Sequence, residues 1–118
     1  MTELVACFSS GEKSQSHVSK LVEAMDWSKI YIITNEKEKT QFKSTKNFEF
    51  VIVNFQKPVN ELIEDLIIKL RGKFSGLEVA LNLVSGNGKE HMAILSALLR
   101  LGVGIRLMAL TKEGVKEL

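Results

Sequence analysis

A loop of small and polar residues stands between an apolar run and a helical pattern in the second half of the chain. It consists of Ser85, Gly86, Asn87, Gly88 and Lys89, between a Val- and Leu-rich run at 78–84 and a helical pattern over 89–101. The first N–H groups of a helix lack intrahelical partners, and the helix dipole favours negative charge beside them. The two glycines can take positive φ and let a ligand approach the backbone. This segment, with its lysine, predicts an anion-binding site.

A second loop of the same kind follows the first apolar run, residues 4–8. It contains Ser9, Ser10 and Gly11, and Lys13 stands two residues further on. In a doubly wound parallel sheet the first and fourth strands lie side by side, and ligands bind beyond their carboxyl ends. We therefore expect both loops, with all the residues named so far, to bind one ligand.

The chemistry of these loops leaves several interpretations open. Neither loop matches a Walker A or a G-x-G-x-x-G pattern, and no G-x-S-x-G elbow occurs, so both could be ordinary tight connections. Ser9 and Ser10 are residue types that more often satisfy a turn than attack a substrate. His91 is more commonly a capping or surface residue, but its ordinary pKa near 6.5 also suits proton transfer. His17, on the first helical pattern, is expected to face solvent.

The totals exclude several classes of protein. The chain has 118 residues, 45% of them hydrophobic, which predicts one globular domain. Its net charge of +2 is too small for a protein that binds the phosphate backbone of DNA, so no direct DNA binding is expected. The only cysteine, Cys7, fits a reducing cytoplasm, and the two histidines lack ligand partners at metal spacing, so neither metal nor cofactor is expected. Neither a signal peptide nor a membrane span is indicated.

Strand and helix patterns alternate along the chain. Strands are predicted at 4–8, 29–34, 48–55, 78–84 and 104–110, and helices at 13–25, 59–70 and 89–101. Residues 35–47 are expected to form a short solvated helix or a loop that buries only Phe42, and residues 111–118 a polar tail. Strand 48–55 is apolar enough to be covered on both faces. This order predicts an α/β fold, a Rossmann-like, doubly wound and mostly parallel sheet, in one domain of residues 1–118.

The last helical pattern is apolar over most of its surface. Few elements of so short a chain are free to cover it, so part of the helix is expected to lie in a two-fold interface. The apolar positions are Met92, Ile94, Leu95, Leu98, Leu99 and Leu101. The sequence therefore predicts a homodimer.

The segment NLVSGNGKEHMAILSALLRLG resembles the signature of CARF domains, the CRISPR-associated Rossmann-like sensors of cyclic oligoadenylate. In that family a strand ends in a turn similar to T/S-G-G-T-K/R, and a helix of small and apolar residues with Met near its start follows. Here the turn ends in Lys89 and the methionine is Met92, while Asn87 and Gly88 depart from the usual Gly-Thr pair. The N-terminal strand that ends at Ser9 also looks like the first ligand loop of the family.

The resemblance implies a homodimer with one shared pocket for cyclic oligoadenylate, with cyclic tetra-adenylate as the expected ring, in type III CRISPR antiviral signalling. Some members of the family also cleave the ring without metal, as ring nucleases that leave a 2′,3′-cyclic phosphate. For such cleavage Ser10 or Ser9 is expected to hold the ribose, Lys89 to neutralise the phosphorus oxygens, and His91, the only candidate, to protonate the leaving oxygen. Two alternatives remain, a small Rossmann-like regulatory or interaction domain and a mononucleotide-binding enzyme. The second is disfavoured because the sequence contains no recognisable catalytic constellation.

Overall fold

The fold is a six-stranded sheet with helices on both faces, seen in a computed structural model that describes residues 2–118. The strands follow the spatial order β3-β2-β1-β4-β5-β6. Along the chain the elements are β1 (Glu3–Cys7), α1 (Glu12–Ala24), β2 (Lys29–Thr34), the 3-10 helix η1 (Glu38–Gln41), β3 (Glu49–Ile52), α2 (Val59–Leu70), β4 (Glu78–Asn82), α3 (Gly88–Arg100), β5 (Gly104–Thr111) and β6 (Gly114–Glu117).

The sheet reverses its winding direction at β1. The chain steps outward from β1 to β2 and β3, and then returns so that β4 lies on the free side of β1. Both neighbours run parallel to β1, and Val5 lies opposite Tyr31 on one side and Leu81 on the other. The predicted Rossmann-like, doubly wound α/β fold is therefore confirmed, with the expected switch point between β1 and β4.

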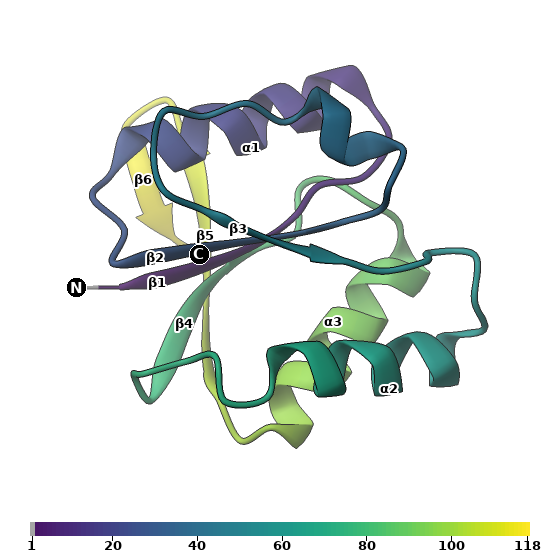
Figure 1. The fold of residues 1–118 in the computed structure, drawn as a ribbon. Coiled ribbons are helices and arrows are strands. Elements are labelled where there is room, and N and C mark those ends of the chain that lie inside the picture. Colours follow the sequence, from purple (N-terminus) through teal and green to yellow (C-terminus); the bar gives the residue numbers. More distant parts are fainter. Residues whose placement is uncertain (1) are drawn as a thin grey trace.

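Successive residues of β1 point to opposite faces, and each face has its own core. Leu4 and Ala6 pack with α1, whereas Val5 and Cys7 pack with α2 and α3. Figure 1 shows α1 on one face of the sheet and α2 with α3 on the other. All four of these β1 side chains are fully buried, which fits a parallel strand that is covered on both faces.

The helices bury the faces that their sequences predict. On α2 the buried positions Leu62, Leu66 and Leu70 recur every four residues, and on α1 the buried positions include Val18 and Leu21. On α3 the buried side is covered by the sheet and by α2, which packs along it, so the expectation that few elements could cover this helix is wrong. No helix within residues 2–118 has both the length and the apolar character needed to cross a membrane.

The C-terminal segment is not the polar tail that the sequence predicts. Residues 114–117 form β6, which pairs antiparallel with β5 as a hairpin, with Gly114 at a φ of 100°. Val115 packs against the core beneath α1, and the Glu117 carboxylate accepts hydrogen bonds from the Arg106 guanidinium at 2.6 and 3.0 Å. Backbone pairing with β5, one apolar contact and one ion pair together hold a segment that carries little hydrophobic signal.

The third strand is shorter and less covered than predicted. β3 ends at Ile52 because its neighbour β2 ends at Thr34, although Val53 N still donates to Thr34 O at 2.9 Å. As the edge strand it leaves Phe50 and Ile52 only partly buried, so it is not covered on both faces.

The segment between β2 and β3 is mostly solvated, as expected. It contains the single-turn helix η1 and buries Phe42 under α1. The ring of Phe42 makes edge-to-face contacts with Phe8 at 5.2 Å and with Phe48 at 4.8 Å between ring centroids. Such pairs favour a fixed packing of this otherwise polar segment on the sheet.

Candidate functional site

The two Ser- and Gly-containing loops meet at the carboxyl edge of the sheet. β1 and β4 are hydrogen-bonded neighbours, so their following loops leave the sheet side by side. Ser9 N donates a hydrogen bond of 2.8 Å to Ser85 Oγ, and both residues are buried. A serine in the loop after β4 thus supplies the acceptor for a backbone N–H in the loop after β1, and the two loops form one unit.

Gly86 occupies a position that a larger residue cannot fill without strain. Its φ is 108°, a region that favours glycine. A Cβ atom here would lie 2.8 Å from Glu90 Oε1, 2.9 Å from Cys7 Sγ and 3.0 Å from His91 Nε2. The tight turn therefore packs α3 against the end of β1, and its glycine is required by both conformation and space.

The start of α3 is closed by its own side chains. Asn87 caps the helix by accepting a hydrogen bond from Glu90 N at 2.9 Å, and the Glu90 carboxylate accepts one from Asn87 N at 3.1 Å. This reciprocal capping box satisfies N–H groups that the sequence predicts to be free for a ligand. The buried Glu90 carboxylate also places negative charge at this helix start, so the capped turn itself offers an anion few free donors.

Lys89 reaches across to the connection between β3 and α2. Its Nζ donates a hydrogen bond of 2.9 Å to Phe55 O. The residue is exposed, and a carbonyl neutralises none of its charge. Lys89 thus remains able to contact an anion at this edge, from a position fixed by the Phe55 carbonyl.

His91 faces back into the turn that precedes its helix. Its Nε2 lies 2.8 Å from Ser85 O. Because a carbonyl oxygen can only accept, Nε2 carries the proton, and Nδ1 is the ring nitrogen left for other partners. The histidine therefore holds the Ser85–Gly86 turn in place from within the first turn of α3.

The start of α1 is open, in contrast to that of α3. Gly11 is its N-cap residue, with a φ of 114° and no side chain that could cap the helix. Ser14 Oγ donates to Gly11 O at 3.0 Å and so does not cover the first N–H groups. Ser10 and Lys13 are exposed beside this helix start. Of the two helix starts at the switch point, α1 is the one whose first N–H groups have no side-chain cap, and its first turn carries both Glu12 and Lys13.

Gln15 is a residue of this site that sequence reasoning missed. Its Nε2 donates to Ser9 O at 2.7 Å and to Glu38 Oε1 at 2.8 Å. It thereby connects the first loop to η1, which follows β2. A glutamine one turn inside a helix is a common surface residue, so the sequence offered no signal for this contact.

A cavity beyond β2 and β3 extends the same edge of the sheet. It has a volume of about 380 Å³ and is lined by Asn35, Glu36, Lys37, Ile52, Val53 and Asn54. Asn35 Oδ1 accepts from Glu38 N at 2.7 Å, and Asn54 Oδ1 accepts from Gln56 N at 2.9 Å. Each asparagine orders its own turn through Oδ1, which leaves its Nδ2 group as a donor. The signal in the sequence that could have indicated this cavity is an asparagine shortly after each of the two strands.

His17 does not face solvent as expected, and it lies partly buried against the end of β4. Asn82 Nδ2 lies 3.2 Å from His17 Nε2 and donates to Met108 O at 2.8 Å, so the partners of this buried asparagine are α1 and β5. The amide donates to the ring, which is therefore neutral and protonated on Nδ1. Burial lowers the pKa of His17 from its ordinary value of 6.5.

Cys7 lies beneath the two loops as a buried thiol. Burial raises its pKa well above the ordinary value, and the nearby Glu90 carboxylate adds to the effect. The thiol therefore stays protonated and packs as a small apolar group between β1 and Gly86.

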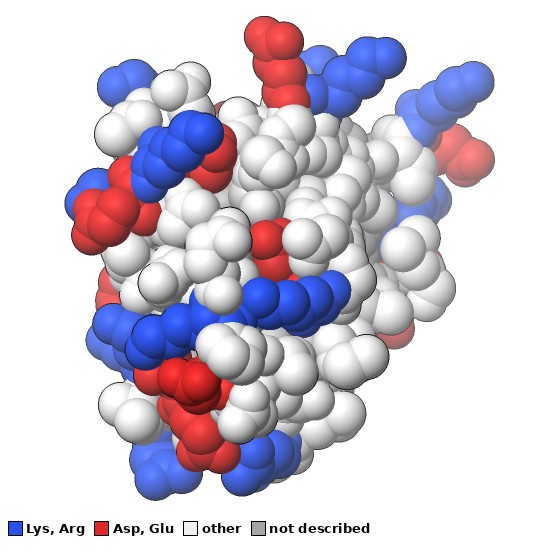
Figure 2. All heavy atoms as spheres, turned by 90° about the vertical axis from the view of Figure 1, so that its right-hand side faces the viewer, with Lys and Arg blue, Asp and Glu red and all other residues white. Residues whose placement is uncertain are grey.

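The carboxyl edge carries charge of both signs. Figure 2 looks at this side of the molecule and shows Lys and Arg side chains in a band across its middle and again at its top and bottom, with Asp and Glu side chains among them. Such a face suits a compact anion better than a long polyanion, because a continuous basic surface is missing from it.

Comparison with known proteins gives no independent assignment. No family model matches the chain, and no curated protein matches it. Within residues 2–118 no three His, Cys, Asp or Glu side chains are grouped as a metal site.

Proposed function

We propose that this protein binds cyclic oligoadenylate at the carboxyl edge of the sheet, as a CARF-like sensor of type III CRISPR signalling. The expected ring is cyclic tetra-adenylate, held between two copies of the chain. The observation that carries the proposal is the open start of α1 at Gly11, which lies beside the hydrogen-bonded pair Ser9 and Ser85 at the switch point. Phosphate is commonly bound by free helix N–H groups, glycine backbone and lysine side chains, and this edge combines all three, with two lysines.

The phosphates would be bound mainly by the first loop. The N–H groups at the start of α1 are without a side-chain cap, and Ser10 and Lys13 are exposed next to them. Lys89 would approach the same anion from the second loop, from its position on Phe55 O. The capped start of α3 would border the ligand site without donating hydrogen bonds to the phosphates.

The adenine bases would use the cavity beyond β2 and β3. Its volume of about 380 Å³ lies within the usual range of small-molecule pockets, and Ile52 and Val53 supply apolar lining. The Nδ2 groups of Asn35 and Asn54 could donate to ring nitrogens of adenine, because their Oδ1 atoms are already used by the backbone.

The shared pocket requires a second copy, and α3 offers an apolar stripe for it. Met92 is 61% exposed and Leu99 is 66% exposed, and a spacing of seven residues places them on one side of the helix. Leu107 on β5 is also exposed, on the sheet face that α3 covers. A stripe of this kind beside the second loop supports a two-fold interface that would bring two carboxyl edges together.

Cleavage of the ring is a separate step that the geometry favours less. In-line attack by a ribose 2′-OH needs a group to protonate the leaving 5′-oxygen. The residue expected to do so is His91, but its Nε2–H already donates to Ser85 O, so only Nδ1 could act, and Nδ1 carries a proton only when the ring is an imidazolium. Incubation of labelled cyclic tetra-adenylate in EDTA with wild type and with Ser10→Ala measures the step. Intact ligand in both samples would make the protein a sensor alone.

Calorimetric titration with cyclic tetra-adenylate tests the proposal. Wild type should bind, and Lys89→Met should weaken binding by about 1–3 kcal/mol, because the substitution removes one charge-assisted hydrogen bond to phosphate. Lys69→Met removes an exposed lysine near the end of α2, away from the carboxyl edge, and should bind like wild type. Equal affinities in all three proteins would show that Lys89 does not contact the ligand. The absence of binding to wild type would reject the proposal.

The competing function is a small regulatory or interaction domain without nucleotide chemistry. The internal capping of α3 by Asn87 and Glu90 favours it, because that turn is complete without a ligand. The same titration separates the two functions, since an interaction domain of this kind would show no binding of the cyclic nucleotide.

A further inference from the structure

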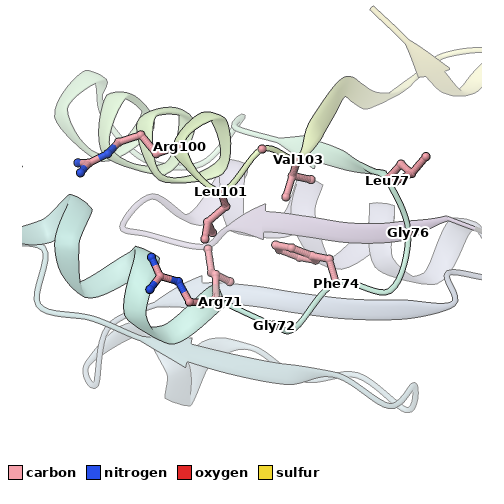
Figure 3. Close-up of a pocket in the computed structure, with 10 residues that line it drawn as sticks. Arg71, Gly72, Phe74, Gly76, Leu77, Arg100, Leu101 and Val103 are labelled. Atoms are coloured by element: carbon pink, nitrogen blue, oxygen red, sulfur yellow. The ribbon is translucent and has the colours of Figure 1, made fainter.

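The amino edge of the sheet, opposite the proposed nucleotide site, carries a cavity of its own. It has a volume of about 440 Å³ and lies where α2 and α3 end, before β4 and β5 begin. Figure 3 shows Phe74, Leu101 and Val103 gathered around it, with Arg71 and Arg100 extending from the two helix ends on one side. The volume lies within the range of sites for small organic molecules.

The positive charge beside this cavity is only partly balanced by ion pairs. Arg100 pairs with Glu64 at 3.1 Å, and Arg106 elsewhere pairs with Glu117 at 2.6 Å. Arg71 makes no ion pair within residues 2–118 and is exposed. A cation at a helix C-terminus is stabilising by itself. Two guanidinium groups beside one cavity, only one of them paired, nevertheless form a site that an anion would complement.

The apolar part of the cavity is partly buried and is held in place by packing and hydrogen bonds. The Phe74 ring packs edge-to-face on Tyr31 with centroids 5.4 Å apart, and the Tyr31 hydroxyl donates to Lys73 O at 2.9 Å. The buried Glu3 carboxylate accepts from Ser75 N and Gly76 N at 3.0 and 2.9 Å, which fixes the loop. Leu77 on the same rim is 93% exposed and places an apolar side chain at the edge of the cavity.

The backbone at both helix ends is open to the cavity. Gly72 and Gly102 have φ values of 77° and 76°, as expected for glycines that end helices. A Cβ atom at either position would meet no atom within 4 Å. The helix ends therefore expose main chain instead of side chains, and the apolar body of a ligand can approach them closely. Because helix C-termini carry partial negative charge, the anionic group of the ligand has to lie against the arginines and not against this main chain.

We propose that this cavity binds a small organic anion with an aromatic or branched apolar body. Arg71 and Arg100 contact the anionic group, while Phe74, Leu77 and Leu101 contact the body. The site is distinct from the proposed cyclic nucleotide site, because the two lie on opposite edges of the sheet. Carboxylates and phosphate monoesters share the required chemistry, and the choice between them is left to the experiment.

Amide NMR titration with simple probes tests the proposal on the whole chain. Phenyl phosphate and phenylacetate each carry both features, inorganic phosphate lacks the body, and phenylacetamide lacks the charge. The amide resonances of Gly72 and Gly102 should shift when phenyl phosphate or phenylacetate is added. The probe that binds more tightly identifies the anionic group that the site prefers. Inorganic phosphate and phenylacetamide should each bind at least about tenfold more weakly.

Two arginine variants and a matched control complete the test. Arg71→Gln and Arg100→Gln should each weaken the better probe about tenfold, with the remaining amide spectrum unchanged. Lys20→Gln removes an exposed cation on α1, on the other face of the sheet, and should leave binding as in wild type. The proposal is overturned if neither charged probe shifts the two glycines at millimolar concentration. It is also overturned if phenylacetamide binds as well as phenylacetate, or if all three variants behave alike.

Discussion

Single residues at the switch point have structural roles that their types alone do not reveal. Gly86 fits a position where no Cβ is tolerated, Asn87 and Glu90 cap each other's backbone, and His91 holds the turn through Ser85 O. The Asn-x-x-Glu spacing is a capping signal that is readable in the sequence. The hydrogen bond of Lys89 to Phe55 O could not be read, because it joins segments 34 residues apart.

The strongest residue effect on stability should come from Gly86. Gly86→Ala combines a strained φ, at about 1–3 kcal/mol, with contacts under 3.0 Å to Glu90 and Cys7, so the free energy of unfolding should fall by about 2–4 kcal/mol. Gly88→Ala, two residues away, meets nothing within 4 Å and should change stability little. Urea unfolding of both variants measures the difference, and similar losses in the two would show that the turn at Gly86 is not tightly packed.

Protonation of His17 should lower stability in mild acid. Its folded pKa lies below the ordinary 6.5, so between the two values the unfolded chain binds more protons. The contribution is complete above the ordinary pKa and is lost as pH falls below it. Urea midpoints measured from about pH 7.5 to about pH 5.5 should decline, and His17→Gln, which keeps an acceptor for Asn82 Nδ2, should flatten the decline. An equally steep decline in the variant would assign it to other groups.

Helices and strands were predictable to the extent that they carry a periodic apolar pattern. The buried faces of α1 and α2 follow their spacing, and the strands of the parallel sheet follow their apolar runs. β6 carries one partly buried valine and depends on a pairing with β5 and Arg106 that no local pattern encodes. The length of β3 likewise depends on where its neighbour β2 ends.

The exposed stripe of α3 should determine assembly. Leu99→Lys places a charge in the proposed two-fold interface and should shift the protein from dimer to monomer in light scattering. Ile68→Lys alters a residue on α2 that is 72% exposed and should leave the mass unchanged. Both substitutions lie at the surface, so stability should change by about 0.5 kcal/mol or less. A monomeric wild type, or a dimer that persists in Leu99→Lys, would contradict an interface at this stripe.

The whole molecule presents two different edges joined by the same two helices. α2 and α3 start at the carboxyl edge and end at the amino edge, because both connect parallel strands. The order of β1 to β4 followed from the sequence, and so did the meeting of the loops after β1 and β4. The cavities at 35–54 and 70–103 did not, since each is formed by turns whose spacing depends on how the helices pack on the sheet.

The most direct test of the central claim is an amide NMR titration of the wild-type protein with cyclic tetra-adenylate. Glycine amides report on each edge separately, with Gly11, Gly86 and Gly88 at the carboxyl edge and Gly72 and Gly102 at the amino edge. The proposed function predicts shifts in the first group, saturating at one ring per two chains, while the second group stays unchanged. A spectrum that does not respond, or one that shifts only at Gly72 and Gly102, would contradict a cyclic nucleotide site at the switch point.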